Sequence, residues 1–136
     1  ENVYESQSAE RLRLLGRVLA SLEIVAGGKV AAITTMKKDL ADFSARKDIL
    51  EGFINYPRSV IGVEVAVSFR EEGEREYRVS FRSKGRMDVS AVAQSFGGGG
   101  HRNAAGCTVH CPLPEVKEKV FGALEAALTP ISRQDS

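Results

Sequence analysis

Four consecutive glycines followed by a histidine, Gly97 to His101, are the residues of this sequence best suited to hold a ligand. Such a run costs backbone entropy on folding, so it is expected where the chain needs positive φ or where another group approaches the main chain closely. Without Cβ atoms, the amides of Gly98, Gly99 and Gly100 can turn inward as a cluster of donors, and His101 can add a side-chain donor. The run therefore predicts a cup for an oxyanion such as a phosphate or carboxylate.

The residues after the glycines, 101–105, are expected to form one helical turn that Gly106 ends, with free amides aimed at the same oxyanion. The alternative is a flexible hairpin connection that carries a surface histidine. Neither common nucleotide loop is present, because the sequence lacks Gly-x-Gly-x-x-Gly and also the Gly-Lys-Ser/Thr ending of a phosphate loop. Those loops also run from strand to helix, whereas this run follows a predicted helix.

A second group of candidate ligand-binding residues lies at the end of an alternating stretch, at Arg82, Ser83 and Lys84. Arg82 can present a planar fork of donors to a phosphate, while the serine and lysine add a hydroxyl and a second cation. The simpler alternative is a solvated charged face, which is common on exposed strands. The nearby glycine run favours an anion site that combines both groups.

The residues that could bind a metal do not form a convincing site. His101, Cys107, His110 and Cys111 are close in sequence, but on a strand His110 faces away from both cysteines, and there is no close cysteine pair. The aspartates are scattered, without Asp-His-His or Asp-x-Asp. We therefore expect no metal site, no bound cofactor and no complete catalytic machinery in this chain, with His101 at most assisting a reaction.

Composition limits the class of protein. The chain has 136 residues, 43% hydrophobic and 27% charged, with net charge +1, which fits one compact domain without a strong field for long nucleic acid. No stretch is apolar enough for a membrane span and no secretory leader is evident, so a cytoplasmic location is the default expectation. The two cysteines are expected to be reduced. Because the sequence starts at Glu1 without methionine, we interpret it as a piece of a longer protein.

The first half of the chain alternates helices and strands. An amphipathic helix is predicted over 8–22 by the helical spacing of Leu12, Leu15, Leu19 and Leu22. Gly27-Gly28 then predicts a tight hairpin between the stretches 22–26 and 29–35. A short helix is expected around 49–54, stopping near Tyr56 because Pro57 disfavours helical geometry before it. Alternation over 61–69 and 77–81 predicts an antiparallel hairpin joined by residues 70–76, with Arg78, Ser80, Arg82 and Lys84 on its polar face.

The second half completes an α+β fold. Asp88 is expected to cap a helix with Val89, Val92, Ala93 and Phe96 on its buried side, ended by Gly97. A strand over 105–111 and a closing helix over 114–128, ended by Thr129-Pro130, should follow. We therefore expect one mixed sheet of about five strands with helices packed on it. The expected divisions are an N-terminal helix (1–24), one folded domain (25–130) and a disordered tail (131–136).

Three stretches of the sequence resemble a known family. The first is Arg-Val-Ser-Phe-Arg-Ser-Lys-Gly at 78–85, and the second is Met87-Asp88-Val89. The third is Phe-Gly-Gly-Gly-Gly-His-Arg-Asn-Ala-Ala-Gly at 96–106. They are similar to the DHH-associated domain of DHH phosphoesterases. Residues 55–59 and 62–67 resemble the bacterial oligoribonuclease and phosphoadenosine-phosphate phosphatase branch, called nanoRNase. In place of the Asp-Thr-Glu-Gly of many relatives, this chain has Ile49-Leu50-Glu51-Gly52.

The resemblance implies a two-domain exonuclease in which an N-terminal DHH domain holds manganese (or magnesium) and this domain binds a short oligonucleotide or nucleotide substrate. Residues 1–24 would then be a linker helix from the missing catalytic domain, and 25–130 the DHH-associated substrate-binding domain. Arg82 and Ser83 would contact substrate phosphate, Gly98 to Gly100 would supply amides, and His101 would reach toward the phosphate. The alternative is a non-catalytic RNA-binding module of the kind attached to alanyl-tRNA synthetase. Substrate length, RNA or DNA preference, metal identity and oligomeric state do not follow from the sequence.

Overall fold

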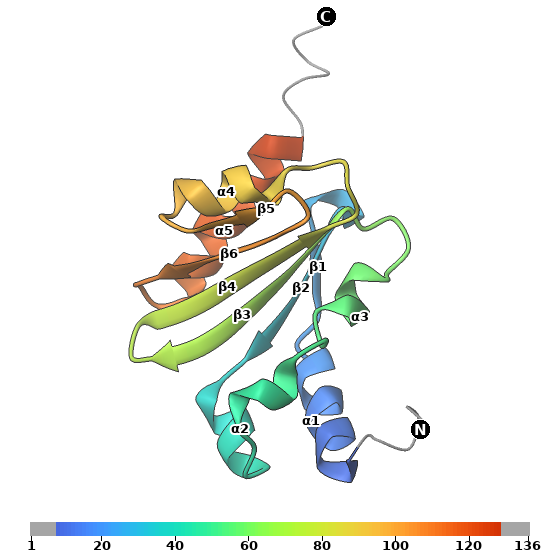
Figure 1. The fold of residues 1–136 in the computed structure, drawn as a ribbon, viewed down its shortest axis with the longest axis vertical. Coiled ribbons are helices and arrows are strands. Elements are labelled where there is room, and N and C mark those ends of the chain that lie inside the picture. Colours follow the sequence, from blue (N-terminus) through green and yellow to red (C-terminus); the bar gives the residue numbers. More distant parts are fainter. Residues whose placement is uncertain (1–7, 129–136) are drawn as a thin grey trace, which may run out of the picture.

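Six strands form one mixed sheet in the order β1-β2-β3-β4-β6-β5 (Figure 1). The computed structural model describes residues 8–128. The strands are β1 (Glu23–Val25), β2 (Val30–Thr35), β3 (Val65–Gly73), β4 (Glu76–Ser83), β5 (Gly99–His101) and β6 (Ala104–Val109). The helices are α1 (Ala9–Leu19), α2 (Lys37–Asp42), α3 (Asn55–Arg58), α4 (Val89–Ser95) and α5 (Leu113–Leu128), with short 3-10 turns η2 (Ala26–Gly28) and η3 (Lys47–Leu50). Among these described strands, only β2 and β3 pair in parallel. The α+β single-domain prediction is confirmed, with six strands in place of about five.

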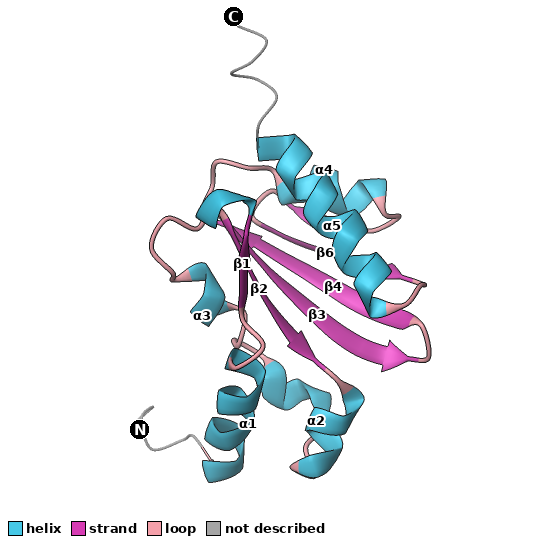
Figure 2. Ribbon diagram, turned by 180° about the vertical axis from the view of Figure 1, so that it is seen from behind, coloured by secondary structure: helices cyan, strands magenta, loops and turns pink. Residues whose placement is uncertain are grey.

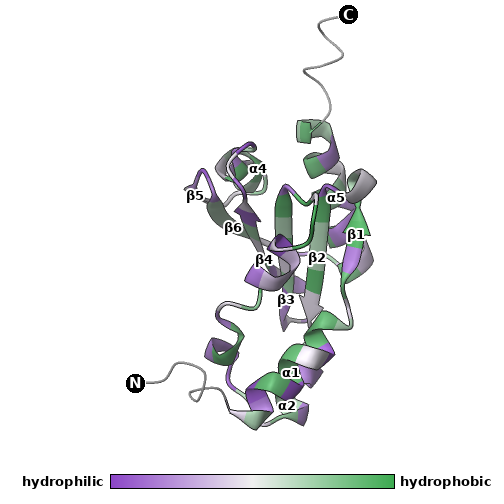
Figure 3. Cartoon of the chain, turned by 90° about the vertical axis from the view of Figure 1, so that its right-hand side faces the viewer, coloured by the Kyte–Doolittle hydropathy of each residue, from purple (hydrophilic) through white to green (hydrophobic). Residues whose placement is uncertain are grey.

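Helix α1 begins where Ser8 accepts a hydrogen bond from the backbone N–H of Arg11 at 3.0 Å. Its buried residues are Leu14, Leu15 and Val18, whereas Leu12 is 53% exposed. Two residues of the predicted stripe are correct, since Leu15 is buried and Leu19 packs against the same cluster, whereas Leu12 and Leu22 are exposed. The buried side is set by the partners Ile33 and Phe53. Figure 3 shows the helix with both hydrophobic and hydrophilic segments. The expected hairpin of β1 and β2 is confirmed.

The crossover from β2 to β3 differs from the prediction. In place of a helix over 49–54, the chain forms η3 and then α3, which contains Pro57. Proline is tolerated there because the N–H groups of a first helical turn have no intrahelical partner to lose. The strand expected from Ile61 begins at Val65, and Ile61 is 97% exposed.

The β3–β4 hairpin is longer than expected, since the charged stretch continues both strands and leaves only Glu74 and Arg75 between Gly73 and Glu76. Burial alternates without a break along β4. The predicted separation of a buried face from a polar face on this strand is therefore confirmed.

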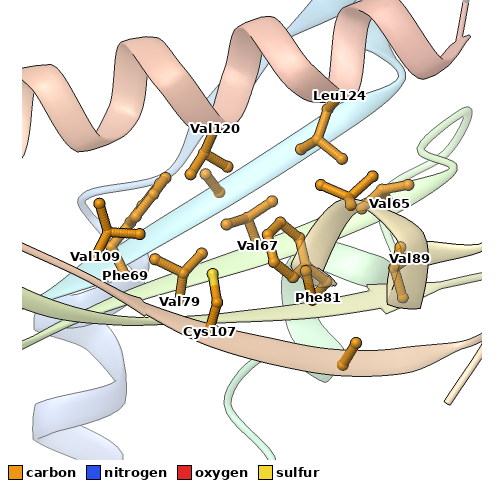
Figure 4. Packing of buried hydrophobic residues seen from close by; sticks show 14 of the residues in the cluster. Val65, Val67, Phe69, Val79, Phe81, Val89, Cys107, Val109, Val120 and Leu124 are labelled. Atoms are coloured by element: carbon orange, nitrogen blue, oxygen red, sulfur yellow. The ribbon is translucent and has the colours of Figure 1, made fainter. Parts of the chain in front are cut away.

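Helices α4 and α5 cover the buried face of the sheet, as Figure 2 shows from behind. Asp88 caps α4 by accepting from the N–H of Ser90, and Gly97 ends the helix with φ of 86°, both as predicted. Val116, Val120 and Leu124 of α5 belong to the core cluster. Figure 4 shows Val120 and Leu124 pointing from the helix toward the strands. The predicted end of α5 at Thr129-Pro130, the tail over 131–136 and the first seven residues lie outside the described residues.

Helix α1, α2 and the η3 segment cover only part of the other face. Their apolar cluster reaches the sheet at Ile33 of β2. In Figure 1, which views this face, β4 and β6 are not crossed by any helix. We call the part of this face that carries Arg78, Ser80, Arg82, Gly106 and His101 the open face. The fold thus leaves the basic side of β4 accessible.

Candidate functional site

The glycine run ends in a β-hairpin. Gly99, Gly100 and His101 form strand β5 and pair with Gly106, Ala105 and Ala104 of β6. The helical turn expected over 101–105 is therefore wrong, and the surface hairpin considered as its alternative has the observed geometry. The reason is that 104–109 pairs with β4 on one side and β5 on the other, which satisfies far more main-chain groups than one isolated turn.

The three glycines proposed as amide donors differ in their surroundings. The Gly98 N–H donates to the carbonyl of Ala93 at 2.9 Å, and a Cβ at Gly98 would lie 2.1 Å from the carbonyl oxygen of Gly106. Gly100 has φ of 144°, and its Cβ would lie 2.6 Å from the Cα of Ala105. A Cβ at Gly99 would meet no atom within 4 Å. Close packing therefore requires Gly98 and Gly100, whereas Gly99 borders open space.

His101 and Arg82 lie on the same face of the sheet. The register places Ala104 directly opposite both His101 and Arg82, and residues directly opposite one another share a face. Two strand spacings separate their backbones, about 10 Å. Both side chains are long enough to approach one ligand that lies over Ala104, a small residue. The structure thus places on one face of the sheet the two residues that sequence reasoning assigned to one site.

Arg82 has no carboxylate partner among the described residues. Its Nη1 donates to the carbonyl of Phe81 at 3.0 Å. By contrast, Arg70 pairs with Glu72, and Arg86 pairs with Glu64 at 3.5 Å. A half-buried guanidinium without a counterion is able to accept an external anion.

Ser83 points to the other side of the strand from Arg82. Its side chain is 2% exposed, and its Oγ lies 2.9 Å from the Met87 carbonyl and 3.1 Å from Asn103 Oδ1. The same oxygen accepts from the N–H of Gly85 at 3.1 Å. The hydroxyl is thus fully used inside the domain. Lys84 is exposed and its Nζ lies 3.4 Å from the carbonyl of Val60.

The turn after His101 is tied to the end of β4. The N–H of Ser83 donates to the carbonyl of Asn103 at 2.9 Å, and the N–H of Val89 donates to the carbonyl of Arg102 at 2.9 Å. Together with the contact of Ser83 Oγ to Asn103, these bonds fix the turn relative to β4 and α4. The position of His101 therefore depends on Ser83, although Ser83 does not share its face.

A cavity of about 420 Å³ borders Arg82 on the side away from His101. Its floor comes from β3 and β4 and its wall from residues 47–54; the lining includes Ser68, Ser80, Leu50, Phe53 and Ile54. Sequence reasoning missed this cavity, although Ser68 and Ser80 are directly opposite in the register and show the same alternation. A larger cavity, about 630 Å³, is lined by none of the predicted site residues.

Cys107 and Cys111 are free and buried, as expected for core thiols. Burial raises the pKa of Cys107, so its reactive thiolate form is disfavoured. Among residues 8–128, no three histidine, cysteine or acidic side chains are grouped as a metal site would require. In the same range, no helix is both long and apolar enough to cross a membrane.

Comparison with known families identifies the fold. Residues 25–129 match the DHHA1 domain, and the chain belongs to this family. It is also homologous to the bifunctional oligoribonuclease and PAP phosphatase NrnA of Thermus thermophilus, with 34% identity over 118 residues, covering 86% of this chain and 35% of that protein. The chain thus spans about a third of the length of this relative.

Two solved structures place the domain in a wider context. An exopolyphosphatase-related protein from Bacteroides fragilis superposes with a TM-score of 0.83 and 34% identity, covering 91% of this chain and 36% of that protein. The C-Ala domain of Aquifex aeolicus alanyl-tRNA synthetase has a TM-score of 0.52 and 15% identity, covering 74% of this chain and 91% of that domain. The second likeness shows a shared fold alone.

Proposed function

We propose that this chain is the substrate-binding domain of a metal-dependent phosphodiesterase that degrades short oligonucleotides, dephosphorylates 3′-phosphoadenosine-5′-phosphate, or does both. The observation that carries the proposal is the unpaired Arg82 guanidinium on the same face as His101, beside the open edge at Gly99. The homology to NrnA supports nucleotides as the ligands.

In the proposed complex, Arg82 donates two parallel hydrogen bonds to a substrate phosphate, and His101 approaches the same phosphate from β5. Gly99 and Gly100 lie on an edge strand, whose outward main-chain amides have no partner in the sheet and are available to the ligand. Gly98 contributes by packing and Ser83 by holding the turn that carries His101. The domain therefore binds and orients the phosphate.

Bond cleavage is assigned to a DHH domain outside this chain, which would hold manganese or magnesium. The described residues do not fit such a metal pair, because their carboxylates and histidines are not grouped. The partners of this domain are thus the catalytic domain of the same polypeptide and a short oligonucleotide or nucleotide. Residues 1–24 would connect the two domains.

The proposal is tested by titrating the chain with 3′-phosphoadenosine-5′-phosphate and with a dinucleotide that carries a 5′-phosphate, while the amides of residues 99–101 are followed by NMR. We expect these amides to shift, and Arg82→Gln to weaken binding about tenfold or more. Arg13→Gln is the control, because Arg13 lies on α1 and is 68% exposed. Unshifted amides at millimolar ligand would refute the proposal.

A tRNA-binding module of the alanyl-tRNA synthetase kind is distinguished by the same titration at increasing salt. An RNA that contacts many phosphates loses affinity steeply with salt, whereas a ligand held at one or two phosphates does not. With a net charge of +1, we expect the shallow dependence. A steep loss with a long RNA, together with no response to nucleotides, would favour the module.

A further inference from the structure

Arg78 lies on the open face, four residues before Arg82 on the same strand. Its guanidinium extends across the neighbouring strand β6, over Gly106. A Cβ at Gly106 would lie 2.7 Å from Arg78 Nη2 and 3.1 Å from its Cζ. Glycine at this position therefore makes room for the arginine head group, which is held against the main chain of β6.

Like Arg82, Arg78 forms no ion pair with a carboxylate anywhere in residues 8–128. The arginine directly opposite on β3, Arg70, pairs with Glu72 and is thereby neutralised. Arg78 is half buried, so its charge is partly removed from water without a protein counterion to compensate. An external anion would supply that compensation.

The register relates the guanidinium of Arg78, which lies over Gly106, to the backbone position of Arg82. Gly106 lies directly opposite Ser80 of β4 and Gly99 of β5, whereas Arg82 and His101 lie opposite Ala104. The two cross-strand rows are two residues apart, about 7 Å at the rise of a strand. That spacing is comparable to the length of one nucleotide unit in an extended chain.

The surface between the two arginines is flat. Gly99, Gly106 and Ala104 form it, and Gly99 has open space above its Cα. No large side chain on β5 or β6 therefore separates the head group of Arg78 from the site of Arg82 and His101. A ligand lying along this surface would extend from the guanidinium of Arg78 to Ala104, the residue opposite Arg82 and His101.

We propose that Arg78 forms a second phosphate position, so that the domain selects ligands with two phosphate groups one nucleotide apart over nucleoside monophosphates. This inference rests on the proposed function, since it extends the phosphate site of Arg82. The ligand class is a nucleoside 3′,5′-bisphosphate or an oligonucleotide with a 5′-phosphate and an internal phosphodiester.

The test compares the affinities of 3′-phosphoadenosine-5′-phosphate, 5′-AMP and 3′-AMP for the wild-type chain and its variants by isothermal titration calorimetry. In the wild type we expect the bisphosphate to bind about tenfold tighter than either monophosphate. Arg78→Gln should remove most of this preference while changing the tighter monophosphate's affinity less than about twofold, and Arg78→Lys should restore part of it. Arg82→Gln should weaken all ligands, and Arg13→Gln should change none.

Several results would overturn the inference. If the bisphosphate and the tighter monophosphate bind equally well to the wild type, the second position does not exist, although the proposed function stands. If Arg78→Gln weakens all ligands by the same factor, Arg78 acts as a general charge and not as a separate phosphate position. If the wild type binds no nucleotide, both the inference and the proposed function fail. Unchanged thermal unfolding of Arg78→Gln confirms that a lost preference is not lost folding.

Discussion

Alanine substitutions at Gly98 and Gly99 test separately whether the glycine run is needed for packing of the domain or for the approach of a ligand. At Gly98 the new methyl group would lie 2.1 Å from the Gly106 carbonyl oxygen and 2.7 Å from the Cα of Cys107. Both atoms belong to the main chain of β6, which pairs on both sides and has no room to move. Overpacking costs about 1–3 kcal/mol and occasionally more, and backbone collisions this close place the cost at the upper end, about 3 kcal/mol.

Gly99→Ala should behave differently, because its methyl group would meet nothing within 4 Å and its φ is not in the positive region. Lower entropy of the unfolded chain then stabilises the variant by up to about 1 kcal/mol. The two substitutions should therefore differ by about 3–4 kcal/mol in the free energy of unfolding, a large part of the roughly 5–15 kcal/mol of a typical domain.

Urea unfolding followed by circular dichroism measures this difference, and calorimetric titration with 3′-phosphoadenosine-5′-phosphate measures binding. We expect Gly98→Ala to be strongly destabilised, and Gly99→Ala to fold normally but bind more weakly, since its methyl group occupies the approach to the β5 edge. Equal stability of the two variants would refute the packing argument. Undiminished binding by Gly99→Ala would contradict a ligand at this edge.

Three further predictions concern the scaffold. Leu124→Ala should lower the free energy of unfolding, measured in urea, by about 2–5 kcal/mol, because Leu124 is fully buried. Leu12→Ala should lower it little, because Leu12 is 53% exposed. Similar losses of stability in the two variants would contradict the assigned core. Hydrogen bonds from Ser90 lower the pKa of Asp88. The ionised carboxylate therefore stabilises the fold at pH values above the ordinary aspartate pKa, and this stabilisation is lost as the pH falls from about 5 toward 2. Asp88→Asn should therefore flatten the dependence of Tm on pH in this range, and unchanged curves would show that the cap does not contribute. A thiol reagent should label Cys107 only as fast as the protein opens, because burial raises the pKa of Cys107; rapid labelling without denaturant would contradict its placement.

Local patterns predicted much of the fold. The alternation along β4, the Asp88 cap and the buried side of α5 were correct because each depends on a short stretch of sequence. The prediction failed where distant contacts decide the structure. Ile61 continues the alternating pattern of β3, yet the chain pairs with β2 only from Val65 onward.

The candidate site was predicted in part. Sequence reasoning proposed Arg82 and His101 together, and the register places them on one face. It did not foresee that Gly98 and Ser83 are occupied inside the domain, because the atoms that occupy them come from Ala93 of α4 and from Met87 in the loop after β4, whose positions depend on the fold. Arg78 was seen only as part of a basic face, since its contact with Gly106 depends on the pairing of β4 with β6. Whether the predicted residues bind phosphate stays a prediction.

The shortness of the edge strand β5 affects how this domain avoids associating with itself. An edge strand exposes unpaired main-chain groups, and a long one is a template on which another chain can add its own strand. Both edge strands here, β1 and β5, are only three residues long. Three residues give too few hydrogen bonds to hold a foreign strand, but their amides are enough for a small anion. Short edges therefore offer little template for strand addition while they leave main-chain groups exposed to solvent.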